Sequence, residues 1–222
     1  VAFTSSDTSI ATVDTNGKVT CLKAGEVTIT ASAQNHASVK GEVTVIVCGD
    51  YDRTGWEVSE TSHNLPTTPT KNSKTAAFDS DAGGKSNFGL TRPGKLSGGL
   101  DLRAQPDIQI WFVVDMKNAH KVNYFRIRHI STTQSDFGTR WHKFVEILGS
   151  DDGENFTSIS TNVDFKSLST VLANQETGNI SIPVSKYRYL KFVSDKNCFD
   201  STGNTAQINE LYIGREKITA DK

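Results

Sequence analysis

Apolar and polar residues alternate with a period of two along most of the chain, which is the pattern of half-buried β-strands. Within residues 1–48 the alternation places apolar side chains at Ile10, Val13, Val19, Val27, Ile29, Ala31, Val43, Val45 and Val47. The sequence Asp-Thr-Asn-Gly at 14–17 interrupts it with a turn signal. A complete sandwich has about seven strands. The pattern therefore predicts only the later strands of such a domain.

From residue 52 onward the pattern stays β and aromatic residues become denser. Apolar runs predict strands at 108–114, 122–130, 144–148, 156–159, 187–193 and 207–213, and the turn cluster 150–155 makes the middle pair a hairpin. Long polar stretches at 63–74, 79–105, 131–139 and 195–206 predict loops that gather at one end of a sandwich. We expect an all-β chain: a domain at 1–48, a short linker at 49–51, and an antiparallel sandwich or jelly roll at 52–222.

The composition of the chain argues against several classes of function. The 24 Lys+Arg against 25 Asp+Glu, without a basic run, argue against nucleic acid as a partner. The longest apolar run, 110–114, is too short to span a bilayer, and the chain opens at Val1 without a leader sequence, which leaves its compartment open. Cys21, Cys48 and Cys198 lack metal-site spacing; we expect buried free thiols, with one disulfide as the alternative.

Residues 3–33, FTSSDTSIATVDTNGKVTCLKAGEVTITASA, resemble the second half of the bacterial Ig-like domain of group 2. Phe3 stands at the family's Trp position, and Cys21 replaces a usual Gly. The resemblance implies an Ig-like β-sandwich whose first strands are missing. Such domains serve as spacers or adhesive modules on secreted and surface proteins, so it also implies an extracellular or bacterial cell-surface location.

Four motifs in residues 52–214 resemble the discoidin domain, also called the coagulation-factor C-type domain, which includes the family 32 carbohydrate-binding modules. They are AAFDSDAGGKSNF at 76–88, IWFVVDM at 110–116, VNYFRIRH with KFVEILGSDDGENF at 122–156, and YRYLKFV with AQINELYIG at 187–214. The first departs from the family by a two-residue insertion. Their order implies a galactose-binding-like jelly roll.

The resemblance also implies one structural calcium ion. Carried over by position, its side-chain ligands are Asp79, Asp81, Ser86 and Glu210, with backbone carbonyls near Ala76 and Gln207. Carboxylate and carbonyl oxygens are the ligands that calcium prefers. The alternative is that Asp79 and Asp81 only stabilise a turn through bonds to the backbone.

A sugar site combines an aromatic face with charged or amide side chains that bond neighbouring hydroxyls. By family position the candidates are Arg128 with Gln134 or Asp136, and Phe199 in the last loop; His129, Arg140, Arg92 and His63 lie on neighbouring segments. A structural salt bridge is the alternative for Arg128, and His129 shares the parity of core residues. Trp56 and Trp111 are expected in the core.

No GxSxG, HExxH or phosphate-binding glycine loop occurs, so we expect no catalysis by these residues. The predicted function is non-catalytic binding of a glycan or oligosaccharide, with galactose-type or amino sugars as the family's common ligands. The alternatives are adhesion to a host protein or glycoprotein, and a spacer or accessory part of a larger glycoside hydrolase. Insertion into a membrane is disfavoured because Leu65, Leu96 and Phe199 are isolated apolar residues in their loops.

Overall fold

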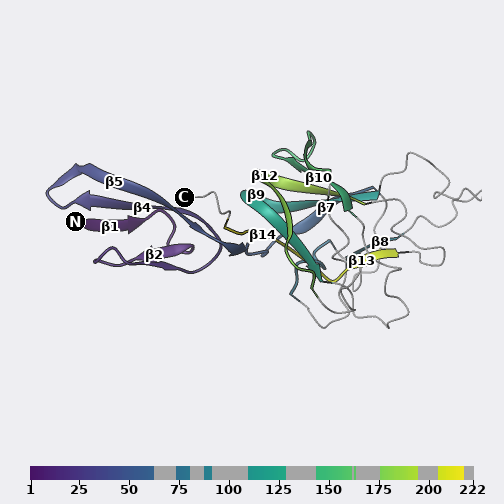
Figure 1. Ribbon diagram of the computed structural model, residues 1–222, viewed down its shortest axis with the longest axis horizontal. Helices are drawn as coiled ribbons and strands as arrows, with labels where there is room; N and C mark the ends of the chain where they lie inside the picture. The colour runs from purple at the N-terminus through teal and green to yellow at the C-terminus, as the bar shows by residue number, and fades with distance from the viewer. Residues whose placement is uncertain are drawn as a thin grey trace, which may run out of the picture. The chain divides into compact units, whose positions relative to one another are not determined.

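The computed structural model describes residues 1–62, 74–80, 88–91, 110–128, 144–161, 163, 176–194 and 205–217. All regular elements in these ranges are β-strands, so the predicted all-β class is confirmed (Figure 1). No helix in the described ranges is long and apolar enough to cross a bilayer. The chain divides into two compact units, Val1–Asp52 with Ile213–Lys222, and Arg53–Tyr212. The predicted domain limits stay a prediction.

The first unit contains two small sheets. One has the order β1-β4-β5, formed by Ala2–Ser5, Gly25–Ala33 and His36–Val47, and the other pairs β2 (Ala11–Val13) with β3 (Val19–Cys21). Val27 and Ile29, two of the positions that the alternation predicted, are buried in its core together with Ala11. Strand β5, which is hydrogen-bonded to β4 in the same sheet, leaves Val39 and Val43 at 64% and 58% exposure. The face of β5 that carries these two valines is therefore only partly covered.

The predicted turn at residues 14–17 joins β2 to β3. The carboxylate of Asp14 accepts the backbone N–H groups of Asn16 and Lys18, both at 2.9 Å. Gly17 has φ 83°, and a Cβ there would lie 2.9 Å from the ring of Phe3. Glycine is therefore required both by the backbone and by the close packing of Phe3.

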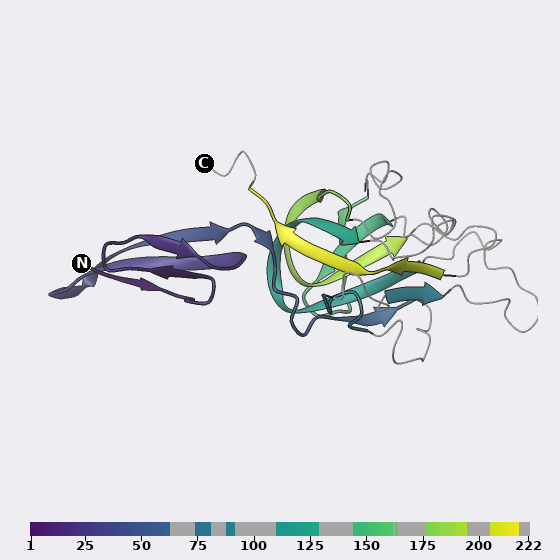
Figure 2. The ribbon, with the colours of Figure 1, turned by 90° about the horizontal axis from the view of Figure 1, so that it is seen from below.

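A larger antiparallel sheet takes most of its strands from the second unit, and β6 and the end of β14 from the first. Its order is β11-β10-β12-β9-β14-β6, with β7 also paired to β9 (Figure 2). The strands are β6 (Gly49–Asp50), β7 (Glu57–Thr61), β9 (Ile110–Arg128), β10 (Phe144–Ser150), β11 (Thr157–Ser160), β12 (Ile180–Ser194) and β14 (Glu210–Arg215). A separate sheet pairs β8 (Phe88–Thr91) with β13 (Thr205–Ile208). Residues 49–50 of the expected linker thus form a strand, which pairs with the end of β14.

Strand β9 differs from the prediction of two separate strands at 108–114 and 122–130. It runs without interruption through Ile110–Arg128, because β12 pairs with both of its halves across register shifts. The middle contains Lys117 in the left-handed region, with φ 65°, and Asp115 Oδ1 accepts its backbone N–H at 2.8 Å. The polar residues between the two predicted strands therefore form an irregularity inside one strand.

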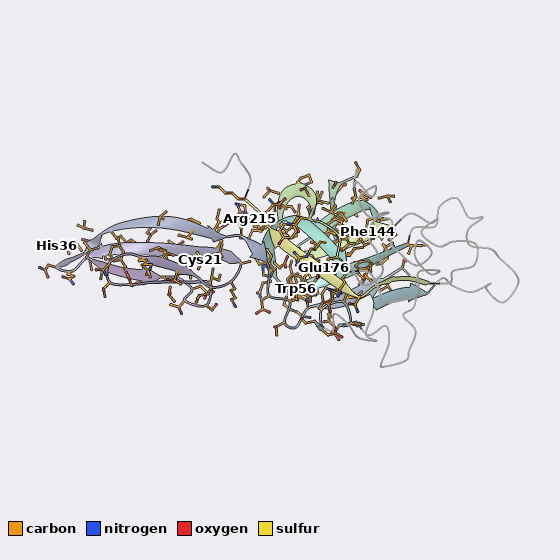
Figure 3. The ribbon with its side chains drawn as sticks, turned by 60° about the horizontal axis from the view of Figure 1, so that its bottom comes forward. Cys21, His36, Trp56, Phe144, Glu176 and Arg215 are labelled. Carbon is orange, nitrogen blue, oxygen red and sulfur yellow. The ribbon has the colours of Figure 1, made fainter. Side chains whose placement is uncertain are left out.

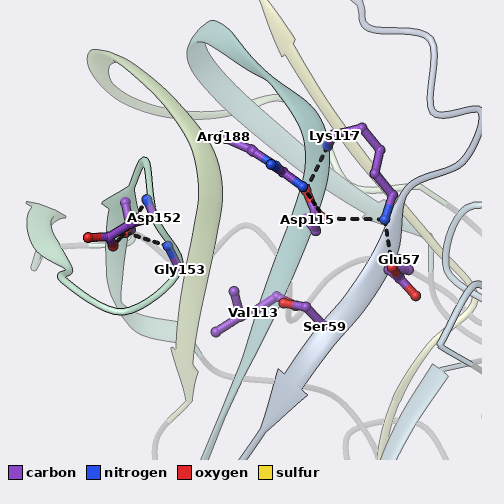
Figure 4. A network of polar contacts seen from close by, with 9 residues as sticks. Glu57, Ser59, Val113, Asp115, Lys117, Asp152, Gly153 and Arg188 are labelled. Atoms are coloured by element: carbon purple, nitrogen blue, oxygen red, sulfur yellow. Dashed lines mark hydrogen bonds and ion pairs between the residues drawn. The ribbon is translucent and has the colours of Figure 1, made fainter.

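The buried carboxylate of Asp115 is paired with two cations at this irregularity (Figure 4). Arg188 binds it through Nε and Nη2, at 2.9 and 3.0 Å, and Lys117 Nζ lies 3.2 Å from its Oδ2. Lys117 Nζ also donates to Glu57 Oε1 of β7 at 2.6 Å. Burial raises the pKa of Asp115, but the bonds from Arg188 and Lys117 outweigh it, so the pKa lies below the ordinary value.

Four phenylalanines form the centre of the core: Phe112, Phe125, Phe144 and Phe192, each 0% exposed. Phe112 and Phe192 stack with centroids 5.2 Å apart, and Phe125 meets Phe144 edge-on at 5.7 Å. They come from β9, β10 and β12, so the core fixes the three central strands against one another.

The hairpin of β10 and β11 is confirmed, and Asp152 organises its turn (Figure 4). Its carboxylate accepts hydrogen bonds from the Asn155 side chain at 2.7 Å and from the backbone N–H groups of Asn155 and Glu154 at 2.8 and 2.9 Å. These bonds hold the pKa of Asp152 far below its ordinary value. Gly153, with φ 82°, supplies the left-handed residue of the turn.

Two expectations about packing are wrong. Cys21 and Cys48 are free but exposed rather than buried. Cys21, labelled in Figure 3, ends the short strand β3, and Cys48 follows β5. Trp56 is a core residue as expected, at 2% exposure, but Trp111 is only half-buried. Lys191 on the adjacent strand covers its ring, with Nζ 3.9 Å from the centroid. Cys198 lies outside the described residues.

Candidate functional site

The start of β14 brings distant segments together around Glu210. Asn209 N donates to the carbonyl of Arg128 at 2.8 Å, and Leu211 N donates to the carbonyl of Ala77 at 2.9 Å. The first bond joins this segment to the end of β9, and the second joins it to residues 74–80, which contain Asp79. Glu210 itself is 0% exposed. A carboxylate so deeply buried needs a cation or hydrogen-bond donors around it.

Arg53 supplies that cation. Its Nη1 donates to Glu210 Oε2 and also to the carbonyls of Ala77 and Leu211, at 3.1 and 3.2 Å. Its Nη2 donates to Ser80 Oγ at 3.3 Å. The Arg53 side chain in this ion pair is only 9% exposed. The guanidinium therefore bridges residues 77–80 and the start of β14.

Asp79 and Glu210, two of the four predicted calcium ligands, lie close enough to interact. Burial raises the pKa of Glu210; Arg53 opposes this rise and the neighbouring Asp79 adds to it. Glu210 Oε1 is buried and has no hydrogen-bond partner. Ser80 has φ 63°, so the turn after Asp79 contains a left-handed residue. Two carboxyl groups this close either share a proton, which agrees with the raised pKa of Glu210, or bind a cation.

The rest of the predicted calcium set cannot be placed. Asp81 and Ser86 lie outside the described residues. Within the described ranges, no group of three or more His, Cys, Asp and Glu side chains is arranged to hold a metal ion. The calcium site therefore stays a prediction.

A second carboxylate, Glu176, holds two arginines at the end of β9. Arg126 Nε lies 3.0 Å from its Oε2, and Arg128 Nη1 lies 3.4 Å from its Oε1 (Figure 3 labels Glu176). Glu176 is placed there because its segment pairs with β9: residues 128 and 176 form a β-bridge, and Ile127 and Thr177 exchange hydrogen bonds of 2.9 and 3.1 Å.

Tyr212 connects the two carboxylate clusters. The guanidinium carbon of Arg53 lies 4.2 Å from the centre of its ring, and that of Arg126 lies 4.3 Å from it. Burial and then the charge of Glu176 raise the pKa of the tyrosine. Cations stack favourably on aromatic faces. The result is a continuous series of side chains that we call the Tyr212 ladder: Glu210, Arg53, Tyr212, Arg126, Glu176 and Arg128.

Among the predicted sugar-binding residues the structure describes only Arg128. The others, His63, Arg92, His129, Gln134, Arg140 and Phe199, lie outside the described residues, as does Asp136. Arg128 has the salt bridge that was its alternative interpretation, but its side chain keeps 21% exposure. The ion pair orients the guanidinium at the end of β9, and sugar binding by this residue stays a prediction.

Sequence reasoning missed Arg53, Glu176 and Tyr212. Arg126 and Arg128 are two positions apart and therefore lie on the same face of a strand. This was a usable signal, because two neighbouring guanidinium groups are stabilised by a nearby carboxylate. Nothing in the sequence indicated that the carboxylate is Glu176, 48 residues from Arg128. Arg53 lies 157 residues from Glu210, and only the packing of β14 joins them.

Comparison with known proteins agrees with both units. Residues 1–45 match the model of the Bacterial Ig-like domain (group 2). An uncharacterized protein of Clostridium acetobutylicum is 49% identical over 47 residues, which is 21% of this chain and 5% of that protein. The chain therefore spans a small fraction of the length of the curated relative that it matches.

The second unit has the fold of family 32 carbohydrate-binding modules. The C-terminal domain of a chitobiase from Bacteroides fragilis aligns with TM-score 0.53 and 16% identity, over 75% of this chain and 98% of that one. The CBM32-3 module of a family 31 glycoside hydrolase from Clostridium perfringens gives 0.52 and 17%, over 75% and 95%. A further module of that organism, solved in complex with GalNAc-β-1,3-galactose, gives 0.50 and 14%, over 74% and 99%. The predicted fold is confirmed.

Proposed function

We propose that the second unit binds carbohydrate without catalysis, as a module of an extracellular or cell-surface protein. The observation that carries the proposal is the fold, which aligns with a Clostridium perfringens module solved with GalNAc-β-1,3-galactose. The partner is a glycan or oligosaccharide, and galactose-type or amino sugars are the first to test.

The part of the site that the structure describes is compatible with this role. Arg128 ends β9 with its guanidinium oriented by Glu176 and partly exposed. A guanidinium presents several N–H donors in a fixed plane, which suits neighbouring hydroxyls of a sugar ring. We propose Arg128 and Phe199 as the main contacts. A shallow site of this kind buries little area, so we expect weak binding per module and stronger binding to repeated ligands.

A glycan array with the intact chain tests the proposal. Arg128→Ala and Phe199→Ala are expected to lose binding to the glycan that the unchanged chain recognises. Arg126→Ala is the matched control, because Arg126 shares Glu176 with Arg128 and has nearly the same exposure, 22% against 21%. If the folded protein binds no glycan, the proposal fails. Binding to a host protein that free monosaccharide does not compete away would favour adhesion instead.

The proposal includes one structural calcium ion, held by Asp79 and Glu210 together with Asp81 and Ser86. The closeness of the fully buried Glu210 carboxyl group to Asp79 supports it. When bound, the ion would neutralise the carboxylates and fix residues 74–80 against β14. Isothermal titration with calcium, before and after treatment with a chelator, is the direct test. Absence of binding to the folded chain would contradict it.

A further inference from the structure

Within the described part of the chain, strand β5 pairs with a neighbouring strand on one side only. It is the outer strand of the sheet β1-β4-β5 and pairs with β4 along its length (Figure 1). All residues from His36 to Thr44 are exposed, although successive residues of a strand point to opposite faces. An antiparallel sheet usually buries one face against a core. Over this length β5 therefore has two open faces and one open edge.

The open edge is long and carries apolar side chains. β5 has 12 residues, and Val39 and Val43 lie on one of its faces at 64% and 58% exposure. Long apolar edge strands pair with further strands unless charges, prolines or bulges prevent it. The central sequence VKGEV, residues 39–43, has no proline and contains two charged residues, Lys40 and Glu42. The arrangement of these two charges therefore decides which strand the edge accepts.

Lys40 and Glu42 point to the face opposite the valines and form an ion pair within the strand. Lys40 Nζ lies 2.7 Å from Glu42 Oε1, and both side chains are about half exposed. This bond raises the pKa of Lys40 and lowers that of Glu42, so both groups are charged at neutral pH. No heavy atom lies within 4 Å of the Cβ position of Gly41, which separates them. The centre of β5 thus has one charge of each sign on either side of an uncrowded glycine.

This central sequence is complementary to itself in one antiparallel register. In a twofold-symmetric pair of strands, one residue lies opposite its own copy. With Gly41 in that position, Lys40 lies opposite Glu42 of the second copy, and Val39 lies opposite Val43. A register centred on Lys40 or on Glu42 would place like charges directly opposite each other, which is unfavourable. Only the register centred on Gly41 pairs the two opposite charges and the two valines at the same time.

We propose that β5 is a docking surface for a second copy of this chain, and that the two copies pair antiparallel along β5 about a twofold axis at Gly41. The pairing continues the sheet through both copies and brings the four exposed valines together on one face. Two ion pairs on the other face fix the register. One pair of strands buries less area than the roughly 1,200–2,000 Å² of a stable interface, so the dimer is weak. A dimer carries two of the second units and strengthens binding to repeated glycans, a consequence that rests on the proposed function.

Sedimentation equilibrium of the full chain, from micromolar to millimolar concentration, measures the dissociation constant of the dimer. In Lys40→Glu positions 40 and 42 are both acidic, and in Glu42→Lys both are basic, so each variant places like charges opposite its own copy. We expect each variant alone to dimerise about tenfold more weakly than the unchanged chain, or less still. Lys18→Glu is the matched control, because it makes the same change of net charge at an exposed position between β2 and β3.

An equimolar mixture of Lys40→Glu and Glu42→Lys separates contact between copies from the ion pair within one chain. In the mixed dimer an acidic side chain lies opposite a basic one at both pairs, although neither chain keeps its own ion pair. We therefore expect the mixture to recover the dimer that each variant loses alone. Unchanged melting temperatures of the two variants check that both are folded.

Four results would overturn the inference. A chain that stays monomeric up to millimolar concentration does not form this dimer. A dimer that neither charge variant weakens uses another surface. A mixture that stays monomeric shows that the two charges act only within one chain. Slow hydrogen exchange of the β5 amides in the monomer shows that another segment of the protein covers the edge. None of these results bears on glycan binding, which the glycan array tests separately.

Discussion

Gly149 in β10 lies under the ring of Tyr187 and offers a sharp test of the packing of the central sheet. A Cβ at position 149 would lie 2.0 Å from Tyr187 Cδ2, 2.5 Å from Cε2 and 2.6 Å from Cγ. Carbon atoms in contact are normally about 3.5–4.0 Å apart. In Gly149→Ala the ring must therefore move by more than about 1 Å, or the strand pair must separate.

The size of the effect follows from this clash. Overpacking costs about 1–3 kcal/mol, and the half-buried Tyr187 can move outward, which keeps the cost inside that range. For a domain of this size each kcal/mol lowers the melting temperature by about 2–4 °C. We expect Gly149→Ala to lower the melting temperature by about 2–12 °C. Gly178→Ala is the control, because no heavy atom lies within 4 Å of its Cβ position.

A double-mutant cycle measured by urea unfolding tests whether the Tyr187 ring causes the loss of stability in Gly149→Ala. With Tyr187→Ala as background, Gly149→Ala should cost less than about 0.5 kcal/mol, because residues that do not interact contribute additively to within this error. If Gly149→Ala costs the same with and without the Tyr187 ring, the packing argument is refuted.

Three further predictions concern the interior of the second unit. Phe192→Ala removes a fully buried ring from a four-phenylalanine cluster and should cost about 3–5 kcal/mol in urea unfolding; a loss below about 1.5 kcal/mol would contradict the described core. Asp115 has a lowered pKa in the folded state, so its contribution is present above its ordinary pKa of 3.8 and is lost as the pH falls through the folded value. Asp115→Asn should therefore destabilise the protein at pH 7, with a gap in melting temperature that narrows below pH 3.8, and a constant gap would refute this. Burial lowers the pKa of His120, which lies beside Trp56, below its ordinary value of 6.5. As the pH falls, the imidazole of the unfolded chain is therefore protonated at a higher pH than that of the folded chain, and this favours unfolding. His120→Gln should flatten the fall of melting temperature between pH 7 and pH 5, and an unchanged slope would contradict it.

The local pattern of the chain by itself determined several strands and turns. The alternation around Val27 and Ile29 predicted β4, and both residues are buried in the first unit. The turn cluster at 150–155 predicted the β10–β11 hairpin, because Asp152 and Gly153 act within their own turn. Such features depend on residues a few positions apart, so the sequence by itself specifies them.

The tertiary structure decided which side chains meet. Two apolar runs that look separate in the sequence form the single strand β9, because both of them pair with β12. The pairing continues on either side of the polar irregularity between them. The Tyr212 ladder depends on contacts between residues 50 and 157 positions apart, Arg126 with Glu176 and Arg53 with Glu210. The spacing of charged residues along the sequence does not show which acidic and basic side chains form ion pairs. Only the order of strands in the sheet brings each carboxylate to its arginine, and that order is set by the burial of the whole core.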